Sequence, residues 1–112
     1  MRNGYIASKA RFLAHNSRPG RPSSVVIVGR TRMVGGNTYH SATVYADGVE
    51  IGRTAVHPGY GREYVYNGMA LLLAVYPDLP DPEQNAAPWR YLSDLGIPLA
   101  TEAIPVARKV DL

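Results

Sequence analysis

The sequence has no cysteine, and it has no acidic residue before Asp47. The lack of cysteine excludes disulfides and cysteine-based zinc sites, and it fits a reducing compartment. Long apolar runs are also missing, because the densest stretch, 69–76, is too short to cross a bilayer. Lys9 and Arg11 interrupt any early apolar run of a secretory signal. These absences predict a soluble, cytoplasmic protein.

The missing acids reveal a strong separation of charge along the chain. The first 46 residues hold seven bases and no acid, whereas the other 66 hold nine acids and five bases. The two parts carry +7 and −4, which combine to the net charge of +3. Such a separation presents a positive surface to an anion, most often phosphate. The basic part can equally pair with the acidic part, within one chain or between copies. The candidate contacts for nucleic acid or another anion are Arg18, Arg21, Arg30 and Arg32.

The length of 112 residues, with 46% hydrophobic and 19% charged residues, predicts one globular domain spanning 1–112. Within it, 24–76 should form the core sheet and helix, and 77–112 should form a proline-rich C-terminal extension. Residues 24–32 read as a strand, because four β-branched residues stand together in it. Residues 33–38 read as a loop.

A β-hairpin is predicted for 39–46 and 49–56, which flank the two-residue turn Asp47-Gly48. This turn implies a register in which residue 46 faces 49, 44 faces 51 and 42 faces 53. One face of the hairpin is then apolar and covers the core, whereas the other carries tyrosines and hydroxyls that can meet water or a ligand. Arg53 falls on the core face, so we expect it near the edge of the sheet.

Helices are predicted for 4–15, 62–76 and 88–95, and residues 97–112 should be extended. The helix over 62–76 is apolar nearly all round, so either a second copy of the protein or the chain's own C-terminal part should cover it. The expected fold class is α+β: a three-stranded antiparallel sheet with one main helix packed on one face and short flanking helices.

Two glycine-containing loops, at 35–40 and 57–62, flank the hairpin and should emerge at the same end of the sheet. Glycines permit close approach of a ligand, tyrosines offer stacking faces, and the second loop opens a helix whose N-terminal N–H groups attract anions. Glu63, in the first turn of that helix, is an alternative partner for the helix dipole. The predicted ligand-binding residues are Asn37, Thr38, Tyr39, His40, His57, Tyr60, Gly61 and Arg62.

Motifs for catalysis are missing from the sequence. It contains no His-x-x-His or His-Glu-x-x-His pattern, no Gly-x-Ser-x-Gly turn and no phosphate-binding loop of the Gly-x-x-x-x-Gly-Lys type. We therefore expect no enzyme activity, no metal and no cofactor. The eight tyrosines beside one phenylalanine suit a site that contacts nucleotide bases, and they equally suit half-exposed sheet faces and subunit interfaces.

The segment Gly36-Asn37-Thr38-Tyr39-His40-Ser41, followed by a hairpin and by Gly59-Tyr60-Gly61 with Tyr64, resembles a family of small uncharacterised proteins encoded by phages and prophages. The resemblance covers 35–76 and implies a setting in host cytoplasm but no activity. Members of that family carry an acid directly after Gly-Tyr-Gly, whereas this chain has Arg62 there and its acid at Glu63.

A looser likeness is to double-stranded-RNA-binding domains, because helix, three strands and helix follow one another in the same order. The helix over 62–76 lacks the lysine cluster with which such domains contact RNA phosphates.

The leading functional hypothesis is a non-enzymatic, phage-type binding protein for a phosphate-bearing ligand. In that setting the ligand would be a nucleotide immune messenger, sequestered as counter-defence, and the protein would form homo-oligomers. The first alternative is a nucleic-acid-binding protein, and the second is an inhibitor that contacts a host protein directly.

Overall fold

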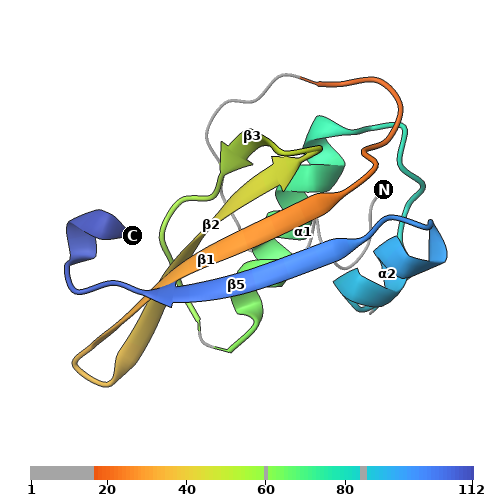
Figure 1. Cartoon of the computed structure of the whole chain (residues 1–112). Coiled ribbons are helices and arrows are strands. Elements are labelled where there is room, and N and C mark those ends of the chain that lie inside the picture. The colour runs from red at the N-terminus through yellow and green to blue at the C-terminus, as the bar shows by residue number, and fades with distance from the viewer. Residues whose placement is uncertain (1–16, 60, 84–85) are drawn as a thin grey trace.

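The computed structural model describes residues 17–59, 61–83 and 86–112. The helix predicted over 4–15 lies outside the described residues. The fold is α+β, with a five-stranded sheet and two α-helices (Figure 1). The prediction of a three-stranded, wholly antiparallel sheet was therefore wrong in the number of strands and in their direction.

Strands β1 (Val25–Val34) and β2 (Asn37–Ala46) form a long antiparallel hairpin. Their pairing is continuous to the two-residue turn at Gly35 and Gly36, whose φ angles are 55° and 84°. Two consecutive positive φ angles match the twist of the flanking strands and are readily adopted by glycine. The predicted loop over 33–38 is thus a tight turn, and both strands extend further than the sequence predicted.

Strand β3 (Val49–Arg53) follows β2 through the predicted turn, where Asp47 and Gly48 have φ angles of 53° and 80°. Residue 46 faces 49 as expected, but the register then shifts between Val44 and Tyr45, so that Val44 pairs with Gly52 and Thr43 with Arg53. This β-bulge makes the expected pairing of residue 44 with 51 and of 42 with 53 wrong. The extra residue turns the Arg53 side chain away from the core face on which the sequence placed it.

Two further strands complete the sheet. The short β4 (His57–Pro58) pairs with the beginning of β2, and β5 (Leu99–Pro105) runs parallel to β1 at the opposite edge from β3 (Figure 1). The sequence indicated only extended chain over 97–112. Strand β5 can pair in parallel with β1 because the chain between them includes a crossover through the two helices.

Helix α1 (Glu63–Val75) packs on one face of the sheet, against β1, β2 and β3, and lies behind the sheet in Figure 1. We call the covered side the inner face and the opposite side the outer face. Helix α2 (Pro88–Asp94) packs beside α1 and β5, and a single 3₁₀ turn, η1 (Lys109–Asp111), follows β5.

Glycines allow α1 to lie very close to β1. A Cβ atom on Gly29 would lie 2.5 Å from the ring of Tyr64, and one on Gly68 would lie 2.8 Å from the side chain of Ile27. Each glycine therefore leaves the space that a side chain of the facing element fills.

The core lies between α1 and the inner face. Ten of the thirteen residues of α1 are buried, including Leu71 and Leu73 on the side that the sequence left without a partner. A single copy of the chain therefore covers this helix, as one of the two predicted alternatives required. Among the described residues, no helix is long and apolar enough to cross a membrane.

Candidate functional site

The structure brings together the two loops that flank the hairpin. Tyr39 pairs with Pro58 and His40 with His57 through β4, and the N–H of Gly59 donates to the carbonyl of Thr38 at 2.9 Å. The loops thus share backbone hydrogen bonds at the beginning of β2.

A cavity of about 520 Å³ opens between these loops, and we call it the loop cavity. Three of the predicted ligand-binding residues line it, with backbone from both loops. Its lining consists of Gly36, Asn37, Thr38, Tyr39, Pro58 and Gly59.

His40 is directed into the core and not into the loop cavity. Its side chain is 1% exposed, its Nδ1 lies 3.3 Å from the carbonyl oxygen of Gly59, and its Nε2 lies 2.6 Å from the amide nitrogen of Asn67 on α1. This network assigns the proton to Nδ1, which donates to Gly59, and makes Nε2 the acceptor. Burial lowers the pKa of His40, opposed by the Gly59 hydrogen bond and the negative charge of Glu63. His40 is therefore a neutral structural residue.

His57 is buried beside His40, and the two rings stack with centroids 6.2 Å apart and planes inclined by 25°. His57 is likewise not among the residues that line the loop cavity. The two histidines therefore lie buried beneath the loops, whereas the sequence predicted that they contact a ligand.

Arg62 lies at the N-terminus of α1, as the sequence predicted, and contacts a tryptophan of α2. Its guanidinium carbon is 5.0 Å from the ring centroid of Trp89 on α2, and Tyr66 meets the same ring edge-on at 6.0 Å. A cation over an aromatic face is a stabilising contact between the two helices. Gly61 forms the turn that precedes α1, with φ of 66°, and Tyr60 is outside the described residues.

The four arginines singled out by the charge separation fall into two groups. Arg18 and Arg21 are exposed in the segment before β1, where the N–H of Arg18 donates to the carbonyl of Val75 at the end of α1. Arg30 and Arg32 are half-buried on the outer face, at the positions opposite Ser41 and Tyr39.

The β-bulge adds a third arginine to the outer face. Arg53 pairs with Thr43 on one side of β2, and Arg30 crosses from β1 on the other side so that its Nη1 donates to the Thr43 hydroxyl at 3.1 Å. We call Arg30, Arg32 and Arg53 the arginine cluster. Sequence reasoning missed Arg53 as a site residue because a hairpin without a bulge directs it inward; its awkward place on an otherwise apolar face was the signal.

Hydroxyl side chains form the floor of the arginine cluster. Thr43 is 1% exposed and Ser41 is 2% exposed, although both stand on the face that α1 does not cover. The Ser41 Oγ is buried and has no hydrogen-bond partner among the described residues. A buried hydroxyl without a partner carries a desolvation cost, and a bound acceptor would remove it.

The arginine cluster is not neutralised by the chain's own acids. In the described part of the chain, arginine–carboxylate pairs form between Arg90 and Asp94 and between Arg108 and Asp111, and none includes a member of the cluster. Arg32 donates instead to the backbone carbonyl of Ala107, which holds the chain after β5 against β1. Glu50 and Glu102 also stand on the outer face, at the positions opposite Tyr45 and Val28, but neither forms an ion pair with the cluster among the described residues.

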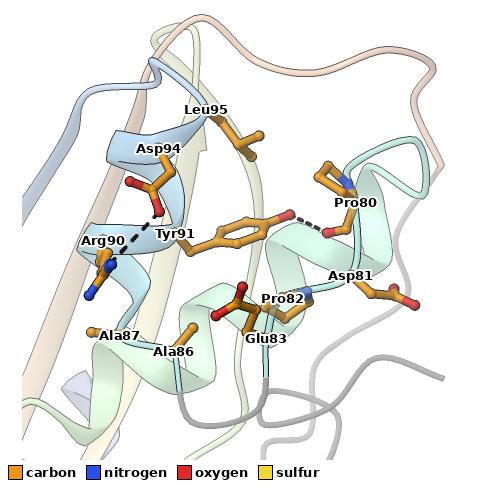
Figure 2. Close-up of a pocket in the computed structure, with 10 residues that line it drawn as sticks. All are labelled: Pro80, Asp81, Pro82, Glu83, Ala86, Ala87, Arg90, Tyr91, Asp94 and Leu95. Carbon is orange, nitrogen blue, oxygen red and sulfur yellow. Dashed lines mark hydrogen bonds and ion pairs between the residues drawn. The ribbon is translucent and has the colours of Figure 1, made fainter.

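A second cavity, of about 570 Å³, lies between α2 and the proline-rich segment before it (Figure 2). The Tyr91 side chain extends toward this segment and its hydroxyl donates to the carbonyl of Pro80 at 2.5 Å, while Arg90 is engaged by Asp94. Asp81 and Glu83 add negative charge to the lining. An acidic lining repels phosphate, so this cavity does not suit the ligand class that the arginine cluster attracts.

No group of three or more histidine, aspartate or glutamate side chains is arranged to hold a metal ion among the described residues. No family model, curated protein or solved structure matches the chain. The features of the structure that point to a function are therefore the outer face and the loop cavity.

Proposed function

We propose that this protein binds a phosphate-bearing ligand of the nucleotide type on the outer face of its sheet and holds it without chemical conversion. One observation carries the proposal: Arg30 contacts Thr43 from β1, Arg53 stands opposite Thr43 on β3, and neither arginine pairs with a carboxylate among the described residues. Two positively charged side chains beside one threonine repel each other. An anion bound between them would attract both and offset that repulsion.

The chemistry of the cluster suits a phosphate group in particular. A guanidinium offers N–H donors in a planar fork that matches two phosphate oxygens at once. The hydroxyls of Ser41 and Thr43 lie between the arginines and can donate to the remaining oxygens. An acidic peptide would place fewer oxygens in the same space, so phosphate is the better-matched anion.

A nucleotide base has a place along the same strand. Tyr39 stands on the outer face, four residues before Thr43, and it also lines the loop cavity. At about 3.3 Å per residue, its ring is roughly 13 Å from the phosphate position, which a base and its sugar can span. Stacking of one base on an aromatic ring contributes about 1–3 kcal/mol.

Binding without chemistry agrees with the roles of the histidines. His40 has both ring nitrogens engaged inside the core, and the ring of His57 stacks on it. Neither therefore serves as a base for a ligand on the outer face. In the setting that the phage-type resemblance implies, the bound nucleotide would be a messenger of host defence, and the protein would sequester it.

A nucleic acid is the second candidate, favoured by the way the tyrosines flank the arginine cluster. Tyr45 stands two residues beyond Thr43 on the same face as Tyr39, so bases could stack on both sides of one phosphate. A polymer that contacts Arg30, Arg32 and Arg53 would bind with an affinity that falls steeply as salt rises, whereas a pocketed nucleotide would saturate at a fixed stoichiometry.

The experiment is to purify the protein from expressing cells, denature it, and analyse the released material by mass spectrometry with a nucleic-acid gel beside it. A homogeneous small phosphate compound supports the leading proposal, and a polymer supports the second candidate. Thermal melting with added nucleoside phosphates and cyclic dinucleotides checks for a ligand lost in purification, because a ligand that binds only the folded state raises the melting temperature.

The variant Arg53→Gln should abolish both the co-purified compound and the thermal shift. Arg90→Gln, which removes the same charge from an exposed position on α2, is the matched control and should change neither. If no compound is released and no phosphate ligand of either size shifts the melting temperature, the proposal is wrong. Direct contact with a host protein then becomes the better explanation.

A further inference from the structure

The outward edge of β5 presents unpaired backbone groups in a regular array. The N–H of Val25 donates to the carbonyl of Pro98 at 3.0 Å, and the N–H of Val106 donates to that of Thr31 at 2.8 Å. In a parallel pair these bonds determine which residues of β5 direct their backbone N–H and C=O groups toward β1. The even-numbered residues of β5 therefore direct their N–H and C=O groups toward β1, and the odd-numbered residues direct theirs away from it.

The outward groups of Leu99, Thr101 and Ala103 have no partner among the described residues, because β5 is the last strand of the sheet and pairs with β1 alone (Figure 1). The side chains from residue 100 to residue 105 are exposed. The opposite edge is protected: β3 has five residues and a bulge beside its neighbour. Among the strands of the described residues, only β5 offers a long, regular edge, and such an edge is a template for another strand.

We propose that a second copy of this chain pairs with β5 along this edge, antiparallel to it and related by a two-fold axis at Thr101. In this register Thr101 faces Thr101 of the second copy, and Leu99 faces Ala103 of the second copy. Each of these is a hydrogen-bonded pair, because all three residues direct their backbone groups outward. The inference does not depend on the proposed ligand.

The charge and the proline of β5 select this register. A two-fold axis at Glu102 would place Glu102 directly opposite Glu102 of the second copy, and like charges in that position are destabilising. The same register would require an N–H from Pro105, which has none. With the axis at Thr101, Glu102 faces Ala100 of the second copy, and Pro105 lies outside the three pairs.

The pairing has a structural consequence for the outer face. A two-fold axis perpendicular to the sheet keeps equivalent faces on the same side, so the two copies would form one continuous sheet. Both arginine clusters would then lie on one side of the dimer.

Single cysteines test the register directly, because the sequence has no cysteine of its own. In a hydrogen-bonded antiparallel pair the Cα atoms are about 5.5 Å apart, within the range of a disulfide. Mild oxidation should therefore link Thr101→Cys into a dimer. Ala103→Cys should not link, because residue 103 faces residue 99 of the second copy, and Val110→Cys, at a highly exposed position, measures random collision.

A proline variant tests the edge without cross-linking. Thr101→Pro removes an outward N–H and leaves the hydrogen bonds to β1 intact, as Pro105 does at another odd position. We expect sedimentation to show a concentration-dependent dimer for the native chain and the 12.2 kDa monomer for Thr101→Pro, with melting temperatures that agree when both are monomeric. The proposal is overturned if Thr101→Cys links no faster than Val110→Cys, if Ala103→Cys links instead, or if Thr101→Pro dimerises as the native chain does.

Discussion

The two faces of the sheet are built from the same strands and have opposite character. On β2, Ala42 and Val44 point to the inner face and pack beneath α1, whereas Ser41 and Thr43 point to the outer face between arginines. The inner face is occupied by the chain itself and stabilises the fold. The outer face carries Arg30 and Arg53 on either side of Thr43, and neither arginine forms an ion pair with a carboxylate among the described residues.

The two faces therefore differ in what each requires: tight packing on the inner face, and arginines without ion-pair partners among the described residues on the outer face. A substitution on the inner face should change the free energy of unfolding and, because only the folded protein binds, should also change binding. A substitution on the outer face should change binding and leave the free energy of unfolding nearly unaltered. If either face behaved like the other in these two respects, the distinction between them would fail.

The largest expected effect belongs to Gly29 on the inner face. The Gly29→Ala variant places a Cβ atom 2.5 Å from the ring of Tyr64, so the ring or the strand must move. Overpacking of this kind costs about 1–3 kcal/mol, which chemical denaturation can measure. Combining Gly29→Ala with Tyr64→Ala should cost less than the sum of the two single variants, because the second substitution removes the clash. Additive costs would contradict the packing of Tyr64 on Gly29.

The next effect is a dependence of stability on pH through His40. Because burial lowers the pKa of His40 from 6.5, its neutral form contributes stability above that pH, and the contribution is lost as pH falls through the folded-state pKa. One such group gives a slope of at most about 1.4 kcal/mol per pH unit. The free energy of unfolding of His40→Gln should fall less between pH 7 and pH 5 than that of the native chain. An equal fall in both proteins would assign the dependence to other groups.

The smallest effect on stability is expected on the outer face, from Thr43→Val. This change keeps the shape of the side chain and removes the hydroxyl that accepts from Arg30, which costs about 1 kcal/mol or less. Binding of a phosphate compound should nevertheless weaken, because Arg30 loses the contact that orients it. Denaturation and thermal-shift titration of one sample measure both quantities. A large loss of stability with unchanged binding would make Thr43 a core residue.

The sequence predicted the elements that local patterns determine and missed those that depend on distant pairing. The Asp47-Gly48 turn and the main helix were correct, because turn chemistry and apolar periodicity act over a few residues. The bulge beside Val44 was missed, since the only local sign of it was the place of Arg53 on an otherwise apolar face. Strand β5 was missed because its partner, β1, lies more than 60 residues earlier in the chain.

Dependence on distant residues also explains which parts of the candidate site the sequence did not predict. The predicted hairpin placed its two flanking loops at the same end of the sheet, and the structure has them side by side with three predicted residues in one cavity. The sequence did not predict the hydrogen bond between His40 and Asn67 of α1, because Asn67 is brought near only by the fold. Nor did it predict that Arg53 joins Arg30, which the bulge alone brings about.

The most direct test of the central claim is a calorimetric titration of three proteins with the nucleotide that gives the largest thermal shift. The proteins are the native chain, Arg53→Gln on the outer face and Arg90→Gln on α2. A charge-assisted contact contributes about 1.5–3 kcal/mol, so Arg53→Gln should weaken binding by about tenfold or more, while Arg90→Gln binds as the native chain does. Equal weakening in both variants would show that net charge alone attracts the nucleotide, and unchanged binding in Arg53→Gln would place the ligand away from the arginine cluster. Either result would contradict the account.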